Sequence, residues 1–209
     1  MGQKKLGFGF MRLPITNKED QSSIDYKQVN DIYFCFQIEY NKSIANKEIQ
    51  MKITLLTVGK IKEKFYVDAI KEYSKRLSRY CKLNIIEVAD EKTTENSTEA
   101  EINIVKEKEA ARLSKHISEG AFIITLEILG KQLDSVELSK KINQLGIEGK
   151  SHIIFIIGGS LGLHESILKR ADFKLSFSKM TFPHQLMRVI LLEQIYRSYR
   201  IINNQPYHK

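Results

Sequence analysis

Apolar runs and amphipathic segments alternate along the chain from residue 51 to its end. Short runs rich in β-branched residues predict five strands, at residues 52–59, 82–90, 121–130, 151–159 and 173–179. Apolar residues at three- and four-residue spacing predict five helices, at residues 62–80, 98–118, 135–145, 164–171 and 183–202. The runs at 121–130 and 151–159 are almost continuously apolar, which is typical of strands buried on both faces. The alternation predicts an α/β domain with a mostly parallel sheet and helices on both faces.

Local signals mark the ends of three predicted helices. Thr98 or Ser97 can cap the second one, because either hydroxyl can accept a hydrogen bond from a free N–H of the first turn. Gly146 and Gly149 are expected to end the helix that begins at residue 135. Pro183 stands at the start of the last helix, where proline is tolerated.

Residues 1–50 do not continue this pattern. Their run LGFGFMRLP resembles the opening of aldo-keto reductases over about the first 35 residues, but the rest of the (β/α)8 barrel that those enzymes need does not follow. An isolated βα unit cannot bury its own apolar face. We therefore expect residues 1–50 to be a poorly ordered or vestigial extension, with Met51 as the natural start of a functional domain at 51–209.

The composition narrows the class of protein. Among the 209 residues 42% are hydrophobic and 28% are charged, a balance typical of a globular domain with its own core. No apolar run approaches the roughly 18 residues of a membrane helix, and the first residues lack the apolar stretch of a signal peptide. Cys35 and Cys81 are too few for a disulfide framework or a metal site. We expect a cytoplasmic protein with reduced thiols and neither a metal nor a membrane partner.

The net charge of +8 favours a polyanionic partner, although a surface adapted for solubility would explain the charge alone equally well. Residues 1–50 contribute little, with seven basic and six acidic side chains. The last 36 residues carry a single acid, Glu193, against six basic side chains: Lys174, Lys179, Arg188, Arg197, Arg200 and Lys209. The positive charge is therefore concentrated at the C-terminal end of the chain.

Three segments could carry chemistry. The glycine-rich turn at 158–162 would let a backbone approach a ligand at the carboxyl end of a strand, but its spacing is not that of a dinucleotide or P-loop motif, and a purely structural turn explains it as well. The polar run SFSKMTF at 176–182 could line a ligand, and the helix after it could equally be a core helix. Considered alone, the tail NNQPYHK at 203–209 is expected to be frayed.

The segments become more specific when they are combined. The stretches MKITLLTVGKIKEKF, TLEILGK, FIIGGSLGLH, SFSKMTFPHQLMRVILLEQIYRSYRI and PYHK follow one another through residues 51–209. Together they resemble the RlmH family of SPOUT-class methyltransferases. The resemblance implies methylation of N(3) of a pseudouridine in 23S rRNA within the assembled ribosome, with S-adenosylmethionine as methyl donor. It also implies an α/β-knot fold with a deep C-terminal trefoil knot, and a homodimer.

The resemblance assigns site residues as well. S-adenosylmethionine would be bound by Leu126, Gly158, Phe177, Ser178, Lys179, Met180, Thr181 and Phe182. Arg188 and His208 are the catalytic candidates, because the imide nitrogen must lose its proton and a nearby cation or base assists that loss. His208 would reach across the dimer. Contacts to RNA would come from Arg197, Arg200, Tyr207 and Lys209, with salt-dependent affinity.

Two other functions stay open on the sequence. An RNA- or ribosome-binding module without methyl transfer would use the same basic C-terminal segment. A nucleotide-binding oxidoreductase would explain the glycine turn and the N-terminal run, but it lacks the dinucleotide fingerprint.

Overall fold

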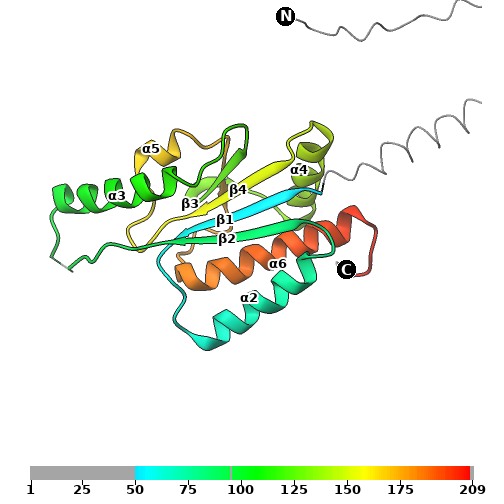
Figure 1. Ribbon diagram of the computed structural model, residues 1–209, viewed down its shortest axis with the longest axis horizontal. Coiled ribbons are helices and arrows are strands. Elements are labelled where there is room, and N and C mark those ends of the chain that lie inside the picture. Colours follow the sequence, from blue (N-terminus) through cyan, green and yellow to red (C-terminus); the bar gives the residue numbers. More distant parts are fainter. Residues whose placement is uncertain (1–49, 95, 208–209) are drawn as a thin grey trace, which may run out of the picture. The chain divides into compact units, whose positions relative to one another are not determined.

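The computed structural model describes residues 50–94 and 96–207, which form five alternating strand–helix pairs (Figure 1). The strands are β1 (Lys52–Val58), β2 (Lys82–Val88), β3 (Phe122–Gln132), β4 (His152–Ile157) and β5 (Phe173–Ser176). The helices are α2 (Lys64–Leu77), α3 (Glu99–Ser114), α4 (Ser135–Ile147), α5 (Glu165–Leu168) and α6 (His184–Ile202). The prediction of an extension at residues 1–50 falls almost entirely outside the described residues.

The five strands form one sheet in the order β2-β1-β4-β3-β5, and every neighbouring pair is parallel. The central strands β1 and β4 are buried along nearly their whole length, which accounts for their continuously apolar sequences. The predicted α/β class with a parallel sheet is confirmed. Because all five strands run the same way, their carboxyl ends lie at a single edge of the sheet, which we call the carboxyl edge.

Helices cover both faces of the sheet (Figure 1). On one face α2, α4 and α6 pack side by side, and Leu191, Leu192 and Ile195 of α6 are fully buried in a core cluster with Phe155 of β4. On the other face α3 and α5 form a smaller cluster with β1 and β4, which includes Ile167 of α5. Successive buried residues of the central strands therefore alternate between the two cores.

Two local predictions are wrong. Residues 121–130 are not buried throughout: Leu129 is 95% exposed, because the pairing of β3 with β5 is interrupted between Leu126 and Lys131. The helix from residue 135 was predicted to end at residue 145, but α4 continues through Gly146 to Ile147, whereas the predicted role of Gly149 is confirmed, because the chain reverses there with a φ of +75°. In β3 the chain departs from the pattern where its neighbour β5 does not pair with it.

The N-terminus of α3 decides between the two predicted caps. The Thr98 hydroxyl accepts a hydrogen bond from the backbone N–H of Glu101, and the Glu101 carboxylate accepts one from the backbone N–H of Thr98 at 2.8 Å. Ser97 instead bonds within the preceding turn, to Thr94. Thr98 is therefore the N-cap of a reciprocal capping box.

We expect Thr98→Ala to lower the free energy of unfolding by about 1 kcal/mol, because it removes the acceptor for a first-turn N–H. Urea unfolding at fixed protein concentration measures the effect. Ser97→Ala is the matched control and should cost less, since its bonds lie in an exposed turn outside the helix. Equal losses for the two variants would contradict the assignment.

Candidate functional site

The carboxyl edge collects the residues predicted to bind the cofactor. Leu126 lies on β3, where it pairs with Ile157 at the end of β4 and with Leu175 near the end of β5. Gly158 directly follows β4, and the run 177–182 directly follows β5. Segments far apart in the sequence therefore meet at one place, where ligands bind in open α/β sheets.

Close packing of the backbone requires a glycine at position 158. A Cβ on this residue would lie 2.8 Å from the carbonyl carbon of Gly162 and 3.1 Å from the backbone nitrogen of Leu163, which is closer than side-chain carbons approach other atoms. The turn folds back on itself, with a bridge between Gly159 and Gly162 and a φ of +79° at Gly162. Glycine at position 158 is thus required by the chain's own backbone.

The run 177–182 combines polar backbone with apolar surface. Its Ser178 hydroxyl accepts a hydrogen bond from the backbone N–H of Met180, and the Ser178 carbonyl accepts one from Ser176. Met180 is 71% exposed, as is most of Leu129 on the neighbouring strand β3. Exposed apolar side chains beside fixed backbone donors and acceptors are the combination that a flat aromatic ligand such as adenine requires. The sequence does not indicate Leu129 as a site residue, because its apolar neighbours predict a buried strand there.

Arg188, a predicted catalytic residue, is fully buried. Its guanidinium donates hydrogen bonds to the Glu87 carboxylate of β2 at 2.7 Å, and to the carbonyl oxygens of Val58 and Gly59 at 2.7 and 2.9 Å. Burial lowers the pKa of Arg188, and the charge of Glu87 opposes this shift. The cation therefore joins α6 to the carboxyl ends of β1 and β2, directly beneath the loop that leaves β1.

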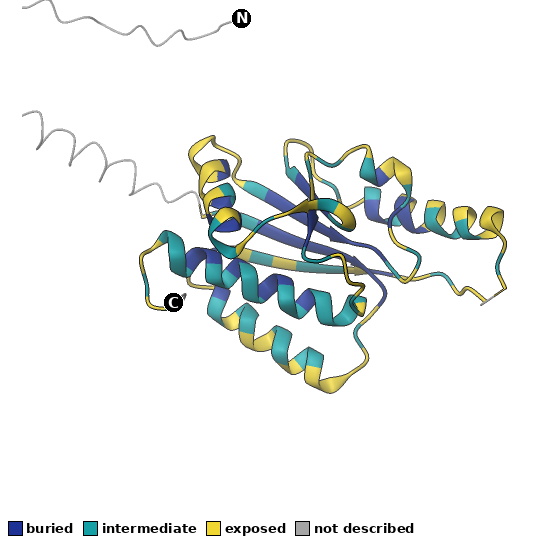
Figure 2. Cartoon of the chain, turned by 180° about the vertical axis from the view of Figure 1, so that it is seen from behind, coloured by how far each residue is buried: buried dark blue, intermediate teal, exposed yellow. Residues whose placement is uncertain are grey.

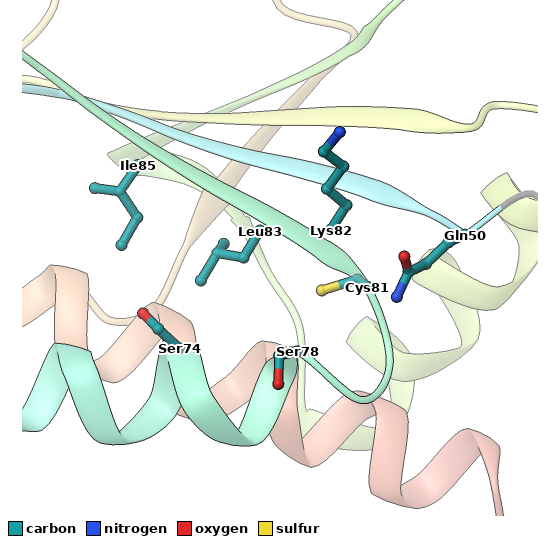
Figure 3. A pocket seen from close by; sticks show the side chains of 7 residues that line it. All are labelled: Gln50, Ser74, Ser78, Cys81, Lys82, Leu83 and Ile85. Carbon is teal, nitrogen blue, oxygen red and sulfur yellow. The ribbon is translucent and has the colours of Figure 1, made fainter.

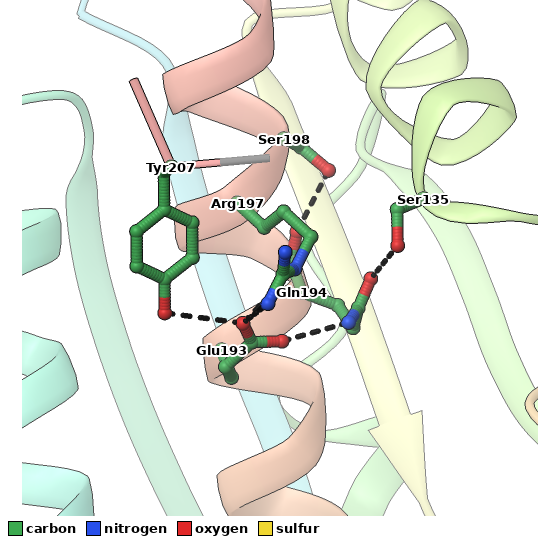
Figure 4. Close-up of polar contacts among 6 residues, drawn as sticks. All are labelled: Ser135, Glu193, Gln194, Arg197, Ser198 and Tyr207. Atoms are coloured by element: carbon green, nitrogen blue, oxygen red, sulfur yellow. Dashed lines mark hydrogen bonds and ion pairs between the residues drawn. The ribbon is translucent and has the colours of Figure 1, made fainter. Parts of the chain in front are cut away.

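Two of the predicted RNA-binding residues, Arg197 and Tyr207, contact Glu193 of α6 (Figure 4). One Glu193 carboxylate oxygen accepts hydrogen bonds from Arg197, at 2.5 and 3.0 Å, and from the Tyr207 hydroxyl at 3.2 Å. Arg197 also lies 4.7 Å from the centre of the Tyr207 ring. Gln194 links this group to Ser135 of α4. Desolvation, followed by the charges of Tyr73 and Glu193, raises the pKa of Tyr207 to about 12, so its hydroxyl stays protonated near neutral pH.

The prediction of a frayed C-terminal tail is wrong for residues 203–207. Arg200 donates a hydrogen bond to the carbonyl oxygen of Pro206 at 3.1 Å, and Tyr80 of the α2–β2 turn donates one to Gln205 at 2.5 Å. The chain reverses at Asn204, whose φ is +52°. The tail thus folds back on α6. His208 and Lys209 lie outside the described residues.

Among residues 50–94 and 96–207, one chain does not bring the two predicted sets together. The cofactor set lies at the carboxyl edge, where α6 begins, whereas Arg197, Arg200 and Tyr207 lie near its far end. A helix of 19 residues spans roughly 28 Å at 1.5 Å per residue. A site that uses both sets therefore cannot be assembled from one copy of α6 and its flanking segments.

A cavity of about 400 Å³ lies elsewhere, between α2 and the edge strand β2 (Figure 3). It is lined by Gln50, Ser74, Ser78, Cys81, Lys82, Leu83 and Ile85. None of the predicted site residues is among them. Burial raises the pKa of the Cys81 thiol to about 12, so the thiol is not a nucleophile near neutral pH.

Within residues 50–94 and 96–207 no cluster of three or more His, Cys, Asp or Glu side chains could hold a metal ion. In the same part of the chain, no helix is both long and apolar enough to cross a membrane.

The chain is similar to known methyltransferases over residues 51–208. Residues 51–208 match the family model described as "Predicted SPOUT methyltransferase". The chain is 66% identical over 159 residues to "Ribosomal RNA large subunit methyltransferase H" of Bifidobacterium adolescentis, and 67% identical over 159 residues to "Putative ribosomal RNA large subunit methyltransferase H" of Methanococcus maripaludis. Each match covers 76% of this chain and all of the relative.

A solved structure from Neisseria gonorrhoeae, described as a "putative methylase family protein", aligns with 72% of this chain and 83% of its own. The sequence identity is 10% and the TM-score is 0.43.

Gly158→Ala is expected to lower the free energy of unfolding by about 1–3 kcal/mol, because the added methyl group would overlap the Gly162 backbone. The matched control is Gly146→Ala inside α4, where the nearest atom is the flexible Met51 methyl group at 3.3 Å. That variant should be neutral or more stable by about 0.5–1 kcal/mol. Urea unfolding compares the two, and a Gly158 variant as stable as the wild type would refute the packing argument.

Arg188→Met is expected to cost about 3–5 kcal/mol of unfolding free energy, because it leaves buried carbonyl groups and the Glu87 carboxylate without their donor. Arg76→Met breaks an Arg–Glu pair that is 41% and 52% exposed, and should cost less than about 1 kcal/mol. Chemical denaturation of both variants tests the difference. Similar losses of unfolding free energy would contradict the claim that the buried Arg188 contacts stabilise the fold more than an exposed ion pair does.

Proposed function

The chain belongs to the SPOUT methyltransferase family, and on this premise we propose that it is a ribosomal RNA methyltransferase that modifies N(3) of a pseudouridine in the large-subunit RNA of the assembled ribosome. The proposal is carried by the match over residues 51–208 together with the carboxyl edge, where Leu126, Gly158 and the run 177–182 end side by side. We place the reaction in the cytoplasm, where assembled ribosomes are found.

We propose S-adenosylmethionine as the methyl donor, held by Leu126, Gly158 and residues 177–182. The donor supplies a methyl group on a positively charged sulfur, so that the bond from carbon to N(3) forms as the carbon–sulfur bond breaks and the N(3) proton is lost. The apolar surfaces of Leu129 and Met180 are suited to an adenine ring, and the ordered backbone of the run 177–182 is suited to its polar edge. Orientation of the two reactants would supply most of the rate acceleration.

Arg188 and His208 are proposed to assist loss of the N(3) proton. Because Arg188 is buried beneath Gly59, it would act through its positive charge and by fixing the loop after β1, rather than by direct contact. His208 is the proposed base. Arg197, Arg200, Tyr207 and Lys209 are proposed to bind the RNA.

We further propose that two chains combine into a homodimer in which the tail of each reaches the carboxyl edge of the other, and that each chain is knotted in its C-terminal part. The separation of the two residue sets along α6 supports the dimer, because a partner chain running in the opposite direction would place one set beside the other.

Incubation of the full chain with labelled S-adenosylmethionine and ribosomes, followed by digestion of the RNA and mass spectrometry of its nucleosides, tests the activity. A single methylated pseudouridine in large-subunit RNA is the expected product. Ribosome binding without methyl transfer would instead identify an RNA-binding module.

Mixing of two inactive variants tests the shared site. Gly158→Ala damages the cofactor turn and Arg197→Ala the tail, and each alone should methylate slowly. After joint refolding at equal concentrations, random assortment puts one intact composite site in half of the dimers, so that roughly a quarter of the wild-type rate returns. No recovery, with dimers formed, would place the whole site within one chain.

A further inference from the structure

The segment that joins β1 to α2 exposes an aromatic ring among lysines. Phe65, in the first turn of α2, is 62% exposed, although phenylalanine is ordinarily a core residue. Lys60, Lys62 and Lys64 are exposed around it, and burial colours show this start of α2 as exposed (Figure 2). We call residues 60–65 the lysine–phenylalanine segment.

Backbone contacts hold this segment beside the carboxyl edge. The backbone N–H of Ile61 donates a hydrogen bond to the Glu87 carboxylate, and that of Lys62 donates one to the side-chain oxygen of Gln185, each at 3.2 Å. Gln185 belongs to the first turn of α6, which begins just after the run 177–182. Arg188 fixes the adjacent Gly59 carbonyl. The segment is therefore a neighbour of the proposed cofactor site, at the same end of the sheet (Figure 1).

The segment carries three lysines against one acid, the exposed Glu63, so its net charge is positive. Among the described residues, neither Lys60 nor Lys62 makes an ion pair. Lys64 pairs with Asp68, but these side chains are 90% and 50% exposed, so water competes strongly with the pair. The Phe65 ring lies against the Tyr66 ring, with centroids 4.1 Å apart and planes tilted by 49°, and most of Phe65 remains exposed. A positioned ring with adjacent cations matches single-stranded nucleic acid, whose bases stack on aromatic side chains while its phosphates bind lysine.

We propose that Phe65 stacks on a base of the RNA next to the methylated nucleotide, and that Lys60 and Lys62 bind its flanking phosphates. This inference rests on the proposed RNA substrate and adds a binding contact to it. A second copy of the chain is a poorer occupant, because a symmetric contact centred on Phe65 would bring the two sets of lysines together. Only one large apolar side chain is exposed in the segment, which is little for a protein interface of about 800 Å² per partner.

The test uses the full chain and ribosomes from cells that lack this gene. Phe65→Ala is compared with Phe65→Trp, which keeps a stacking surface, and with Ile147→Ala, which removes a side chain that is 72% exposed at the opposite edge of the sheet. We expect Phe65→Ala to weaken ribosome binding about tenfold, equivalent to about 1.4 kcal/mol, while the other two bind as the wild type does. Affinity for S-adenosylmethionine and the dimeric state, measured by calorimetry and light scattering, should not change.

Charge is tested separately. Lys60→Gln with Lys62→Gln should reduce the slope of log affinity against log salt by about 1.4, at about 0.7 per phosphate contact, whereas Lys150→Gln should not. Wild-type affinity for Phe65→Ala would overturn the inference, as would dissociation of the dimer by that substitution, which would assign Phe65 to the protein interface. If the wild type binds ribosomes but does not methylate them, the proposed activity fails while the binding comparison still decides the role of Phe65.

Discussion

The arrangement of this protein depends on one buried cation. Arg188 crosses from α6 to the ends of two strands, and the hydrogen bonds of its two terminal nitrogens to Glu87, Val58 and Gly59 replace part of the water that a guanidinium loses on burial. A side chain held at three points fixes the direction of its helix. The run 177–182 precedes this anchor and Glu193 follows it, so both halves of the candidate site are placed by the same contact.

The parallel strands bring the loops of the candidate site together at the carboxyl edge. Strands β1, β4, β3 and β5 are neighbours in the sheet, and each delivers its following loop to one edge. The turn after β4 can be tight because Gly158 has no side chain to meet Gly162. The proposed methyl donor would require apolar surface at this edge, and the proposed RNA would require cations. The apolar Leu129 and Met180 and the lysine–phenylalanine segment offer both at the same end of the sheet.

Much of the fold could be predicted because burial imposes periodicity. A strand that is covered on both faces is apolar along its whole length, and the apolar runs at β1 and β4 therefore predicted two buried strands. The interruption within β3 could not be predicted, because Ile128 and Leu129 continue an apolar run although β5 pairs with β3 only before and after them. The ordered conformation of residues 203–207 could not be predicted from the sequence either. Its order depends on contacts with Tyr80 and Arg200, and Tyr80 is more than 120 residues away in sequence.

By itself, the sequence determined the α/β class, the order of its elements, the concentration of positive charge near the C-terminus and the segments that resemble a methyltransferase family. Each of these features depends on local composition, on the spacing of residues or on recurring residue patterns. Tertiary structure alone decided that Arg188 is buried rather than open to a ligand, that Tyr207 is held by Glu193, and that the two predicted residue sets lie at opposite ends of α6. Those outcomes depend on which distant groups meet in space, and a residue's charge or polarity does not reveal its partner until the chain has folded around it.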